Sequence, residues 1–418
     1  MIENLNPQQL AAVENVSVPM LVLAGAGSGK TRVIVEKIFR LISSGVPADS
    51  IYAVTFTRKA AAEMKDRLGV PAVRVSTFHH LSARILLDAG VKIDFQNSES
   101  FDFDGLISSA VSLLLARSDV LQVWRDRINH LLIDEFQDTD SAQYDLFRLL
   151  VGDSPFTVVG DDDQSIYAWR GACPENMNRL LQDFPDLRLV KLEQNHRSTS
   201  AILSVAAASI AQNPRLFQKR IYSDLCSTNK PLVFQCSSEK NEAAQLVREI
   251  RSAVSAGVNL GDCAVLYRSD WMADVVRAAL SDAGIPFSDS AAENQLDLFQ
   301  SADSIRLSTI HSAKGLEWDH VFILGCERDL FPLSGAVLSE ERCLFYVAVT
   351  RARRTLSFFH CSRRLRFGGF VPAEISPFLS EISSGLFEWK NLESEKMDAV
   401  KFHAFARMEK MRMKRIKP

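Results

Sequence analysis

A short run of small residues, AGAGSGKT (24–31), stands between an apolar segment and a helix-like segment, and its residue types suit phosphate binding. Small side chains let the backbone N–H groups of such a loop approach phosphate oxygens. Lys30 can reach the β- and γ-phosphate oxygens of a nucleotide, and the Thr31 hydroxyl can coordinate magnesium. Alanine stands at position 24, where the consensus for this loop has its first glycine. The residues predicted to surround the phosphates are Ala24, Gly25, Ala26, Gly27, Ser28, Gly29, Lys30 and Thr31.

A second element of the same chemistry is the acidic pair that follows the apolar start of LLIDEFQDTD (131–140). Asp134 would hold magnesium, usually through its water ligands, and Glu135 would polarise the attacking water. An acidic pair after a strand also occurs as a helix cap or on an ordinary surface. Combined with the loop at 24–31, however, the pair predicts hydrolysis of a nucleoside triphosphate, with ATP and Mg²⁺ as the expected ligands.

The elements that must position these groups form two series of short apolar segments that alternate with helix-like segments, as in parallel α/β sheets. Each apolar run ends in polar or glycine-bearing residues, where such sheets carry their ligand sites. We therefore predict two α/β lobes, residues 1–190 and 191–385, followed by a tail, 386–418. The first series is MLVLAGAGSGK (20–30), IYAVTF (51–56), LLIDEF (131–136) and FTVVGD (156–161). The second is PLVFQC (231–236), CAVLYR (263–268), SIRLSTIH (304–311), VFILG (321–325) and TLSFFH (355–360), with helical candidates at 242–254 and 271–283.

Composition excludes several classes of protein. No apolar stretch approaches the roughly 20 residues that span a bilayer, and the N-terminus, MIENLNPQQL, lacks the pattern of a secretory signal. The seven cysteines include no C-x-x-C pair, which argues against a disulfide framework and against zinc or iron–sulfur sites. We expect a cytoplasmic protein without a membrane partner. The net charge of −3 gives no bulk attraction to nucleic acid, so any DNA contact must be local.

The end of the chain differs from the rest, because residues 401–418 contain seven Lys or Arg and a single Glu. Such a segment is either a solvated, frayed tail or a basic arm that contacts DNA phosphates or a partner.

Seven strings identify a resemblance that covers both predicted lobes, from residue 5 to about residue 380. The chain resembles the UvrD/Rep/PcrA-type DNA helicases of superfamily 1, and the strings occur in the order of that family. The resemblance implies two RecA-like lobes with the ATP site in the cleft between them. The strings are LNPQQ (5–9), TFTRKAAAEM (55–64), STFH (76–79), VVGDDDQSIYAWRGA (158–172), LEQNHRST (192–199), LSTIHSAKGLEW (307–318) and FYVAVTRARRTL (345–356).

The resemblance implies roles in the ATP site for residues of both lobes. Gln9 would read the adenine edge, and Gln164 would sense the γ-phosphate. Arg197 and Arg351 would reach the γ-phosphate from the second lobe, as arginine fingers, so that hydrolysis is coupled to closure of the cleft. His196 stands where the family usually has a tyrosine that stacks on adenine; a structural role for this histidine remains the alternative. The remaining implied nucleotide contacts are Arg32, at the phosphate loop, and Glu317, at the ribose.

The resemblance also implies an interface for single-stranded DNA, which proteins hold by stacking bases on aromatic side chains while other groups follow the phosphates. Its aromatic residues could instead be ordinary core residues, and its histidines could be structural. Arg58 stands where asparagine is common and could add a phosphate contact. The residues implied to contact DNA are Phe56, Arg58, His79, Tyr167, Trp169 and His311.

Two insertions that relatives carry are short in this chain. The first would fall between STFH (76–79) and LLIDEF (131–136), so residues of about 80–130 form a reduced insert. The second would fall between IPF (285–287) and LSTIH (307–311), where there is room for little more than a loop. We therefore expect translocation along single-stranded DNA, in the 3′-to-5′ direction by resemblance, more firmly than duplex unwinding.

Two hypotheses remain open. In the first, the chain is an ATP-dependent translocase or helicase acting on single-stranded DNA or 3′-tailed duplex. In the second, it is a nucleotide-controlled DNA-binding or switch subunit that works with a partner such as a nuclease. The intact Gln164, Arg197 and Arg351 favour the motor, whereas the short insertions and the basic tail favour the partnered subunit. A small-molecule kinase is excluded, because it would explain neither the second lobe nor its motifs.

Overall fold

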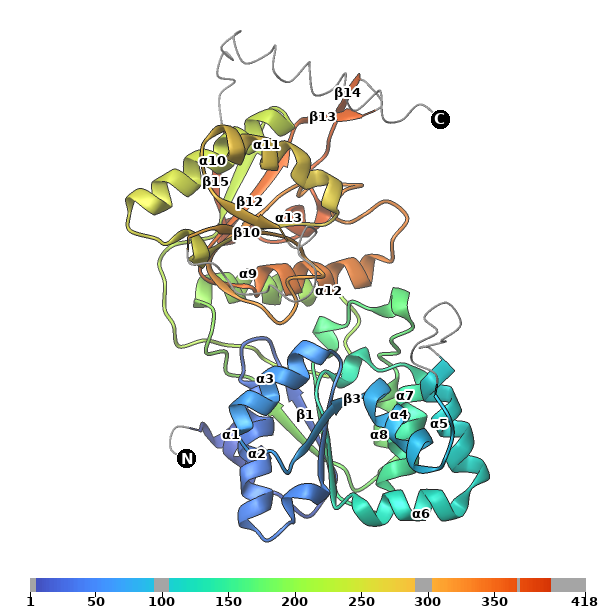
Figure 1. Ribbon diagram of the computed structural model, residues 1–418. Helices are drawn as coiled ribbons and strands as arrows, with labels where there is room; N and C mark the ends of the chain where they lie inside the picture. The colour runs from blue at the N-terminus through green and yellow to red at the C-terminus, as the bar shows by residue number, and fades with distance from the viewer. Residues whose placement is uncertain (1–4, 94–104, 290–302, 367–368, 392–418) are drawn as a thin grey trace, which may run out of the picture.

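Two parallel β-sheets, each covered by helices, form two lobes that lie one above the other in the computed structural model (Figure 1). The structure describes residues 5–93, 105–289, 303–366 and 369–391. All strand pairs within the two large sheets are parallel. This confirms the predicted fold class of two α/β lobes.

The first lobe is built on a six-stranded sheet of order β3-β2-β4-β5-β1-β6. Strand β1, which lies between β5 and β6, is buried along its whole length and serves two cores, because alternate side chains point to opposite faces. Leu21 and Leu23 pack in one core, whereas Met20, Val22 and Ala24 pack in the other. The strands are β1 (Met20–Ala24), β2 (Ile51–Thr55), β3 (Arg74–Thr77), β4 (His130–Ile133), β5 (Phe156–Gly160) and β6 (Arg188–Leu192).

Helices cover both faces of this sheet, as a buried parallel sheet requires (Figure 1). Three of them begin at the carboxyl end of a strand, so their first turns face the same edge of the sheet as the phosphate loop. The helices are α1 (Pro7–Glu14), α2 (Lys30–Ser43), α3 (Arg58–Leu68), α4 (Phe78–Asp88), α5 (Gly105–Ala116), α6 (Ser118–Arg127), α7 (Ser141–Val151) and α8 (Asn176–Asp183).

The described part of the reduced insert, about 80–130, is mainly helical. Helix α5 buries Leu106, Ile107, Ala110 and Leu114 in the same core as α4 and α7. Among the helices that the structure describes, none is by itself long and apolar enough to cross a membrane, and α5 with α6 passes only as a pair bent by 107°. The part of the insert that is described therefore covers the first lobe.

The second lobe is built on a seven-stranded sheet of order β15-β7-β12-β11-β8-β10-β9, with an antiparallel hairpin, β13-β14, beside it. Helices α9 and α12 lie on the face nearer the first lobe, and α10 and α11 lie on the other face (Figure 1). The strands are β7 (Leu232–Cys236), β8 (Cys263–Tyr267), β9 (Phe287–Asp289), β10 (Ile305–Thr309), β11 (Trp318–Ile323), β12 (Ala352–Cys361), β13 (Arg363–Arg366), β14 (Gly369–Pro372) and β15 (Glu388–Asn391). The helices are α9 (Ser200–Ile210), α10 (Glu239–Ser255), α11 (Asp274–Asp282), α12 (Leu338–Val349) and α13 (Pro377–Ser380).

The second sheet continues past the predicted end of its lobe at residue 385. Strand β15 pairs with β7, so residues 388–391 belong to the sheet and not to the tail. The basic segment 401–418 lies outside the described residues. So does most of the short second insertion, 290–302, although β9 and β10 on either side of it are paired neighbours.

The lobes are joined by more than one crossing near the predicted boundary at residue 190. Strand β6 ends in the first sheet at Leu192, and α9 begins in the second lobe at Ser200. After α9 the chain runs back to the first lobe, in a returning segment that includes Phe217 and Tyr222. Phe217 is buried in a core of the first lobe, and Tyr222 forms a β-bridge with Gln194. This returning segment brings second-lobe sequence to the cleft.

Candidate functional site

The phosphate loop lies between β1 and α2, at the carboxyl edge of the first sheet. Gly27 and Gly29 have φ values of 65° and 86°, which favour glycine. A Cβ atom at Gly27 would lie 2.5 Å from Nδ2 of Asn195, so no larger residue fits there. Ser28 closes the turn by donating from Oγ to the carbonyl of Gly25 at 2.7 Å. The loop therefore presents its backbone and the first turn of α2 to an anion.

Residues predicted to bind the base and sugar lie around this loop but not all in one place. Gln9 is buried and donates from Nε2 to the carbonyl of Ser28 at 2.9 Å. The backbone N–H of His196 donates to the carbonyl of Gly27 at 2.9 Å, and its ring is exposed. Arg32 is exposed in the first turn of α2. Gln9 and His196 thus flank the loop.

The loop lysine contacts the acidic pair. Nζ of Lys30 lies 3.2 Å from Oε2 of Glu135. Asp134, at the end of β4, accepts a hydrogen bond from the backbone N–H of Glu135 at 2.9 Å. Glu135 has a positive φ of 53°, an uncommon backbone conformation for a non-glycine residue and one that clusters at functional sites.

The pKa values of the two carboxylates are shifted in opposite directions. Burial, with the neighbouring charge of Glu135, raises the pKa of Asp134. Burial would also raise the pKa of Glu135, but the charges of Lys30 and Lys314 hold it below its usual range. Glu135 is therefore ionised near neutral pH, as a residue that polarises water requires.

Gln137 connects the acidic pair to the next strand and was not singled out from the sequence. Its Nε2 donates to Glu135 at 2.6 Å, and its Oε1 accepts from the backbone N–H of Asp161 at 2.8 Å. A Cβ at Gly160 would lie 2.9 Å from this oxygen, so a larger residue there would displace the Gln137 amide. A signal was present, because Gln137 lies inside LLIDEFQDTD (131–140).

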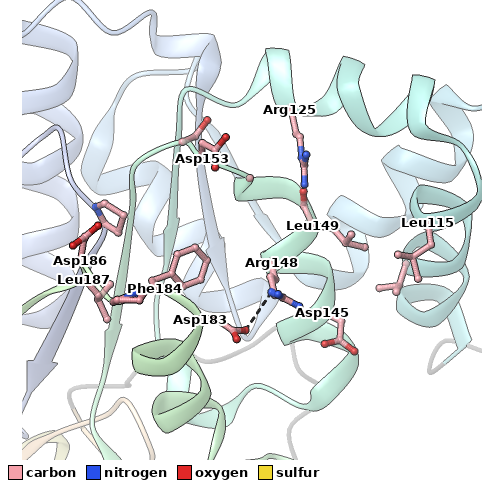
Figure 2. Close-up of a pocket in the computed structure, with 15 residues that line it drawn as sticks. Leu115, Arg125, Asp145, Arg148, Leu149, Asp153, Asp183, Phe184, Asp186 and Leu187 are labelled. Atoms are coloured by element: carbon pink, nitrogen blue, oxygen red, sulfur yellow. Dashed lines mark hydrogen bonds and ion pairs between the residues drawn. The ribbon is translucent and has the colours of Figure 1, made fainter.

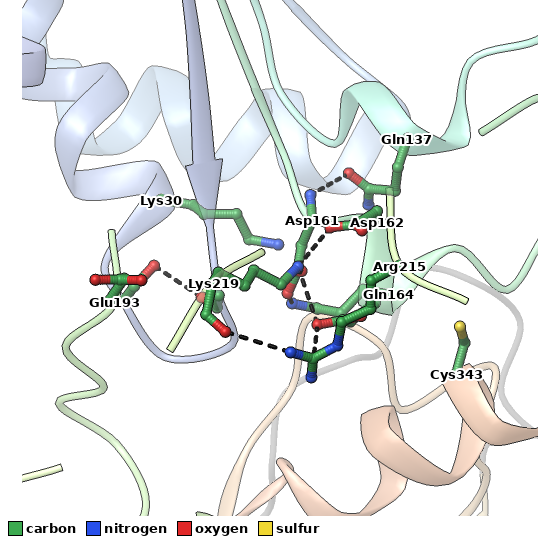
Figure 3. A network of polar contacts seen from close by, with 12 residues as sticks. Lys30, Gln137, Asp161, Asp162, Gln164, Glu193, Arg215, Lys219 and Cys343 are labelled. Carbon is green, nitrogen blue, oxygen red and sulfur yellow. Dashed lines mark hydrogen bonds and ion pairs between the residues drawn. The ribbon is translucent and has the colours of Figure 1, made fainter. Parts of the chain in front are cut away.

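Gln164 lies beside a group of charged residues that sequence motifs did not predict (Figure 3). Its Nε2 donates to Asp161, and Asp161 also accepts from Nζ of Lys219. Lys219 lies in the returning segment after α9, outside every motif, so no pattern in the sequence indicated it.

The two arginines expected to act on the γ-phosphate both contact the second lobe. Arg197 forms an ion pair with Glu317 and donates to the carbonyl of Thr350 at 3.2 Å. Arg351 is buried and donates to the carbonyls of Val347 and Leu316, each at 3.0 Å. Burial, and then the neighbouring charge of Arg197, lowers the pKa of Arg351. Glu317, expected at the ribose, pairs with Arg197 and with Arg353 at 2.5 Å.

Asn195 ties the phosphate loop to the segment that carries Arg197. Its Nδ2 donates to the carbonyl of Ala26 at 2.6 Å, and its Oδ1 accepts from the backbone N–H of Arg197 at 2.8 Å. Three residues on, Oγ of Ser198 donates to the carbonyl of Ala352 at 2.6 Å. A displacement of the second lobe would therefore move residues that hydrogen-bond to the phosphate loop.

Four of the six residues expected at the DNA interface form one aromatic cluster across the two lobes. Phe56 stacks on Tyr167 with ring centroids 5.6 Å apart, and Trp169 lies 6.2 Å from His311 of the second lobe. Arg170 lies over the Trp169 ring at 4.6 Å. Burial, more than nearby positive charge, lowers the pKa of His311 to about 4, so its ring is neutral at pH 7 and suits stacking.

A cavity of about 600 Å³ adjoins this cluster, between the lobes. Trp169 and Arg170 line it from the first lobe, and His311, Arg268 and Glu341 are among those lining it from the second. Trp169 is 63% exposed, so part of its ring is accessible to a ligand. The other two expected contacts, Arg58 and His79, do not line this cavity; they begin α3 and α4 at the carboxyl edge of the first sheet.

Lys314 joins the aromatic cluster to the phosphate site. Its Nζ lies 5.0 Å from the Tyr167 ring centroid and donates to Asp138 at 2.5 Å and to the carbonyl of Gln164 at 2.9 Å. The residue belongs to the second lobe, and all three partners belong to the first. It lies inside LSTIHSAKGLEW (307–318), a motif from which only His311 and Glu317 were selected.

A second cavity, of about 670 Å³, lies away from this chemistry (Figure 2). Its lining includes Gly152, Asp153 and Ser154, just before β5, and Phe184 and Leu187, before β6. Those residues precede their strands, so the cavity lies at the amino edge of the sheet, opposite the phosphate loop. No residue predicted for the ATP or DNA site lines it.

Comparison with known proteins agrees with this geometry. The family model of the UvrD/REP helicase N-terminal domain matches residues 5–100 and 90–185, and that of the UvrD-like helicase C-terminal domain matches residues 190–294 and 288–363. The ATP-dependent DNA helicase Rep of Escherichia coli (strain K12) is 36% identical over 367 residues, covering 68% of this chain and 54% of that protein. DNA helicase II of the same strain is 36% identical over 370 residues, covering 69% and 51%. The ATP-dependent DNA helicase UvrD1 of Mycobacterium tuberculosis is 33% identical over 382 residues, covering 69% and 50%.

The chain thus spans about half the length of the relatives that it matches. The two family models together cover most of the chain, and each falls on one of the two lobes. The chain belongs to the UvrD/REP helicase family.

Proposed function

We propose that this protein is an ATP-dependent translocase that moves 3′ to 5′ along single-stranded DNA in the cytoplasm, with helicase activity on 3′-tailed duplex. The observation that carries the proposal is the unbroken series of contacts from the phosphate loop to the exposed Trp169. Lys30 contacts Glu135, and Gln137 joins Glu135 to Asp161. Asp161 accepts a hydrogen bond from Gln164, and Lys314 joins the carbonyl of Gln164 to the aromatic cluster. The relatives are named ATP-dependent DNA helicases, which supports the same assignment.

In the proposed reaction each charged group of the cleft has a separate task. The loop N–H groups and Lys30 bind the phosphates, Glu135 polarises the attacking water, and Arg197 stabilises the charge of the transition state. Thr31 and Asp134 would hold Mg²⁺, and the buried Asp134, whose charge is disfavoured beside Glu135, fits a site for a cation. A magnesium ion there would neutralise phosphate charge.

The coupling of ATP hydrolysis to movement follows from the lobe on which each charged group lies. Arg197, Arg351 and Lys314 lie on second-lobe segments, whereas the phosphate loop and acidic pair lie on the first lobe. ATP therefore favours the arrangement in which the lobes approach, and product release favours separation. The cavity between the lobes that Trp169 and His311 line, the DNA groove, would change shape with each cycle of ATP hydrolysis. DNA bound in it would therefore be moved along.

A nucleotide-controlled DNA-binding subunit with a nuclease or other partner remains the second candidate. The feature that favours it is the reduced insert, whose described helices cover the first lobe. A partner would then supply the surface that the shortened insertion lacks. Hydrolysis measured with the purified chain separates the two, because a self-sufficient motor needs only single-stranded DNA.

Replacing Lys30 by alanine tests the hydrolytic site. We expect single-stranded DNA to stimulate ATP hydrolysis by the wild-type chain more than duplex DNA or RNA does. Lys30→Ala should lower the stimulated kcat by about 10²–10³-fold, because it removes a donor to the transferring phosphate. Lys65→Ala, on the exposed side of α3, is the matched control and should keep wild-type activity. A rate of ATP hydrolysis that is the same with and without DNA would instead favour the partnered subunit.

Replacing Trp169 by alanine tests the DNA groove. Loss of the exposed ring should weaken binding of a single-stranded oligonucleotide by about 1–3 kcal/mol, since a base would lose its stacking surface. The affinity can be measured by fluorescence anisotropy at fixed salt. Trp271→Ala removes another indole, 51% exposed but outside the groove, and should leave the affinity unchanged. Equal effects of the two substitutions would place the DNA elsewhere.

A further inference from the structure

The side chain of Lys219 lies among three consecutive carboxylates, of which Asp161 and Asp162 are labelled in Figure 3. Its Nζ contacts Asp161, lies 2.5 Å from Oδ1 of Asp162 and 3.0 Å from Oδ2 of Asp163. The spacing of these carboxylates would also suit a cation, but the ammonium group already lies among them. Burial would lower the pKa of Lys219, yet the three aspartates raise it well above its usual value, so this lysine is charged.

Asp161 has a second partner, the side-chain amide of Gln164. One carboxylate oxygen contacts Lys219, and the other accepts a hydrogen bond from Nε2 of Gln164. Burial alone would raise the pKa of Asp161, but the charges of Lys219 and Lys30 lower it below its usual range. An ionised carboxylate can only accept hydrogen bonds. The amide of Gln164 must therefore present its nitrogen to Asp161 and turn its oxygen away.

The position of Lys219 in the chain links this amide to the segment of Arg197. Within the returning segment, the backbone N–H of Arg220 donates to Oε1 of Glu193 at 2.7 Å. Tyr222 donates from its backbone N–H to the carbonyl of Glu193 at 3.0 Å and bridges Gln194. Residues 193–194 directly precede Asn195, which holds both the phosphate loop and Arg197. These hydrogen bonds hold the returning segment beside the arginine finger. Its lysine contacts Asp161, the carboxylate that also accepts from the Gln164 side chain.

We propose that Lys219 is a positioning residue for ATP hydrolysis, which acts through Asp161 to set the orientation of the Gln164 amide. The inference rests on the proposed function, because it gives Gln164 a task in hydrolysis. With its nitrogen held by Asp161, Gln164 offers its oxygen as the acceptor, the end that can orient an attacking water. An uncharged partner at position 161 would let the amide reverse.

A matched pair of substitutions separates this role from simple packing. Asp161→Asn and Asp163→Asn each remove one negative charge that faces Lys219, but only Asp161 contacts Gln164. We expect Asp161→Asn to lower the kcat of DNA-stimulated hydrolysis by about 10²-fold, the effect of a misplaced catalytic group, with little change in the KM for ATP. Asp163→Asn should keep the wild-type kcat. Thermal unfolding of both variants reports whether each is folded.

Variants of Lys219 complete the test. Lys219→Met combined with Asp163→Asn removes one positive and one negative charge, so the cluster keeps its wild-type net charge. This double variant should lose kcat as Asp161→Asn does, relative to Asp163→Asn alone. Lys219→Arg keeps the charge and should recover part of the loss.

The outcomes distinguish the inference from the function on which it rests. If Asp161→Asn and Asp163→Asn lower kcat equally, or if the Lys219 double variant hydrolyses ATP as Asp163→Asn does, the positioning role is overturned and the motor is not. If the wild-type chain shows no DNA-stimulated hydrolysis, both the proposed function and the inference are overturned.

Discussion

Replacing Arg197 by alanine should lower the kcat of DNA-stimulated ATP hydrolysis by about 10³-fold or more, the usual effect of removing an arginine finger. ATP binding should be largely retained, because the loop amides and Lys30 belong to the other lobe. The reason is geometric: the backbone of Arg197 is held against the phosphate loop by Asn195, while its guanidinium is on the second-lobe side, paired with Glu317. Steady-state hydrolysis, with binding of a fluorescent ATP analogue measured separately, distinguishes the two effects.

Arg353 supplies the matched control for this experiment. It pairs with the same carboxylate, since its Nη2 lies 2.5 Å from Oε1 of Glu317, but its side chain is 42% exposed. Arg353→Ala therefore removes an ion pair of Glu317 without removing a phosphate ligand, and the kcat should stay near the wild-type value. An equal loss in both variants would mean that Glu317, and not a finger at Arg197, carries the effect.

The second large effect is expected on stability, at the buried charge cluster of the second lobe. Arg364 donates to both oxygens of Glu242 at 2.8 Å and from Nε to Glu327 at 2.6 Å, and all three side chains are buried. Arg364→Met would leave two carboxylates buried without their cation, which should destabilise the lobe by about 3–5 kcal/mol. Urea denaturation should show the loss as an earlier midpoint.

A surface ion pair provides the comparison. Arg328 lies 2.8 Å from Glu374, with side chains 58% and 75% exposed. Arg328→Met should change the stability by no more than about 1 kcal/mol, because water screens such a pair. Similar midpoints for the two variants would show that the buried cluster contributes no more than a surface contact does.

The strands with strong apolar runs were predictable, and those at the margins of the sheets were not. The segments read as strands at 20–30, 51–56, 131–136 and 156–161 contain β1, β2, β4 and β5, which are buried on both faces. Strand β6, RLVKL, lies at the edge of its sheet with its first residues exposed, so its composition is mixed. Strand β15 lies within the predicted tail, because its short polar sequence carries no apolar run and its place in the sheet depends on pairing with β7.

Within the site, the sequence indicated residues inside the motifs but not several of the residues that contact them. Gln137 and Lys314 lie inside motifs of the sequence, so a local signal for both residues was present. Lys219 lies in NPRLFQKR (213–220), where a lysine between apolar and basic residues resembles any surface lysine. Its burial depends on the path of the chain after α9.

The sequence by itself determined the local chemistry of this protein: a loop that must contain glycine, an acidic pair at a strand end, and two α/β lobes in order. These are short-range properties, because steric limits on the backbone and the alternation of side chains along a strand act over a few residues. Only the tertiary structure decided which charges meet across the cleft. Lys219 reaches Asp161, 58 residues before it, and Lys314 reaches Asp138, 176 residues before it. Such pairs depend on how two separately formed sheets close on each other, and no local pattern carries that information.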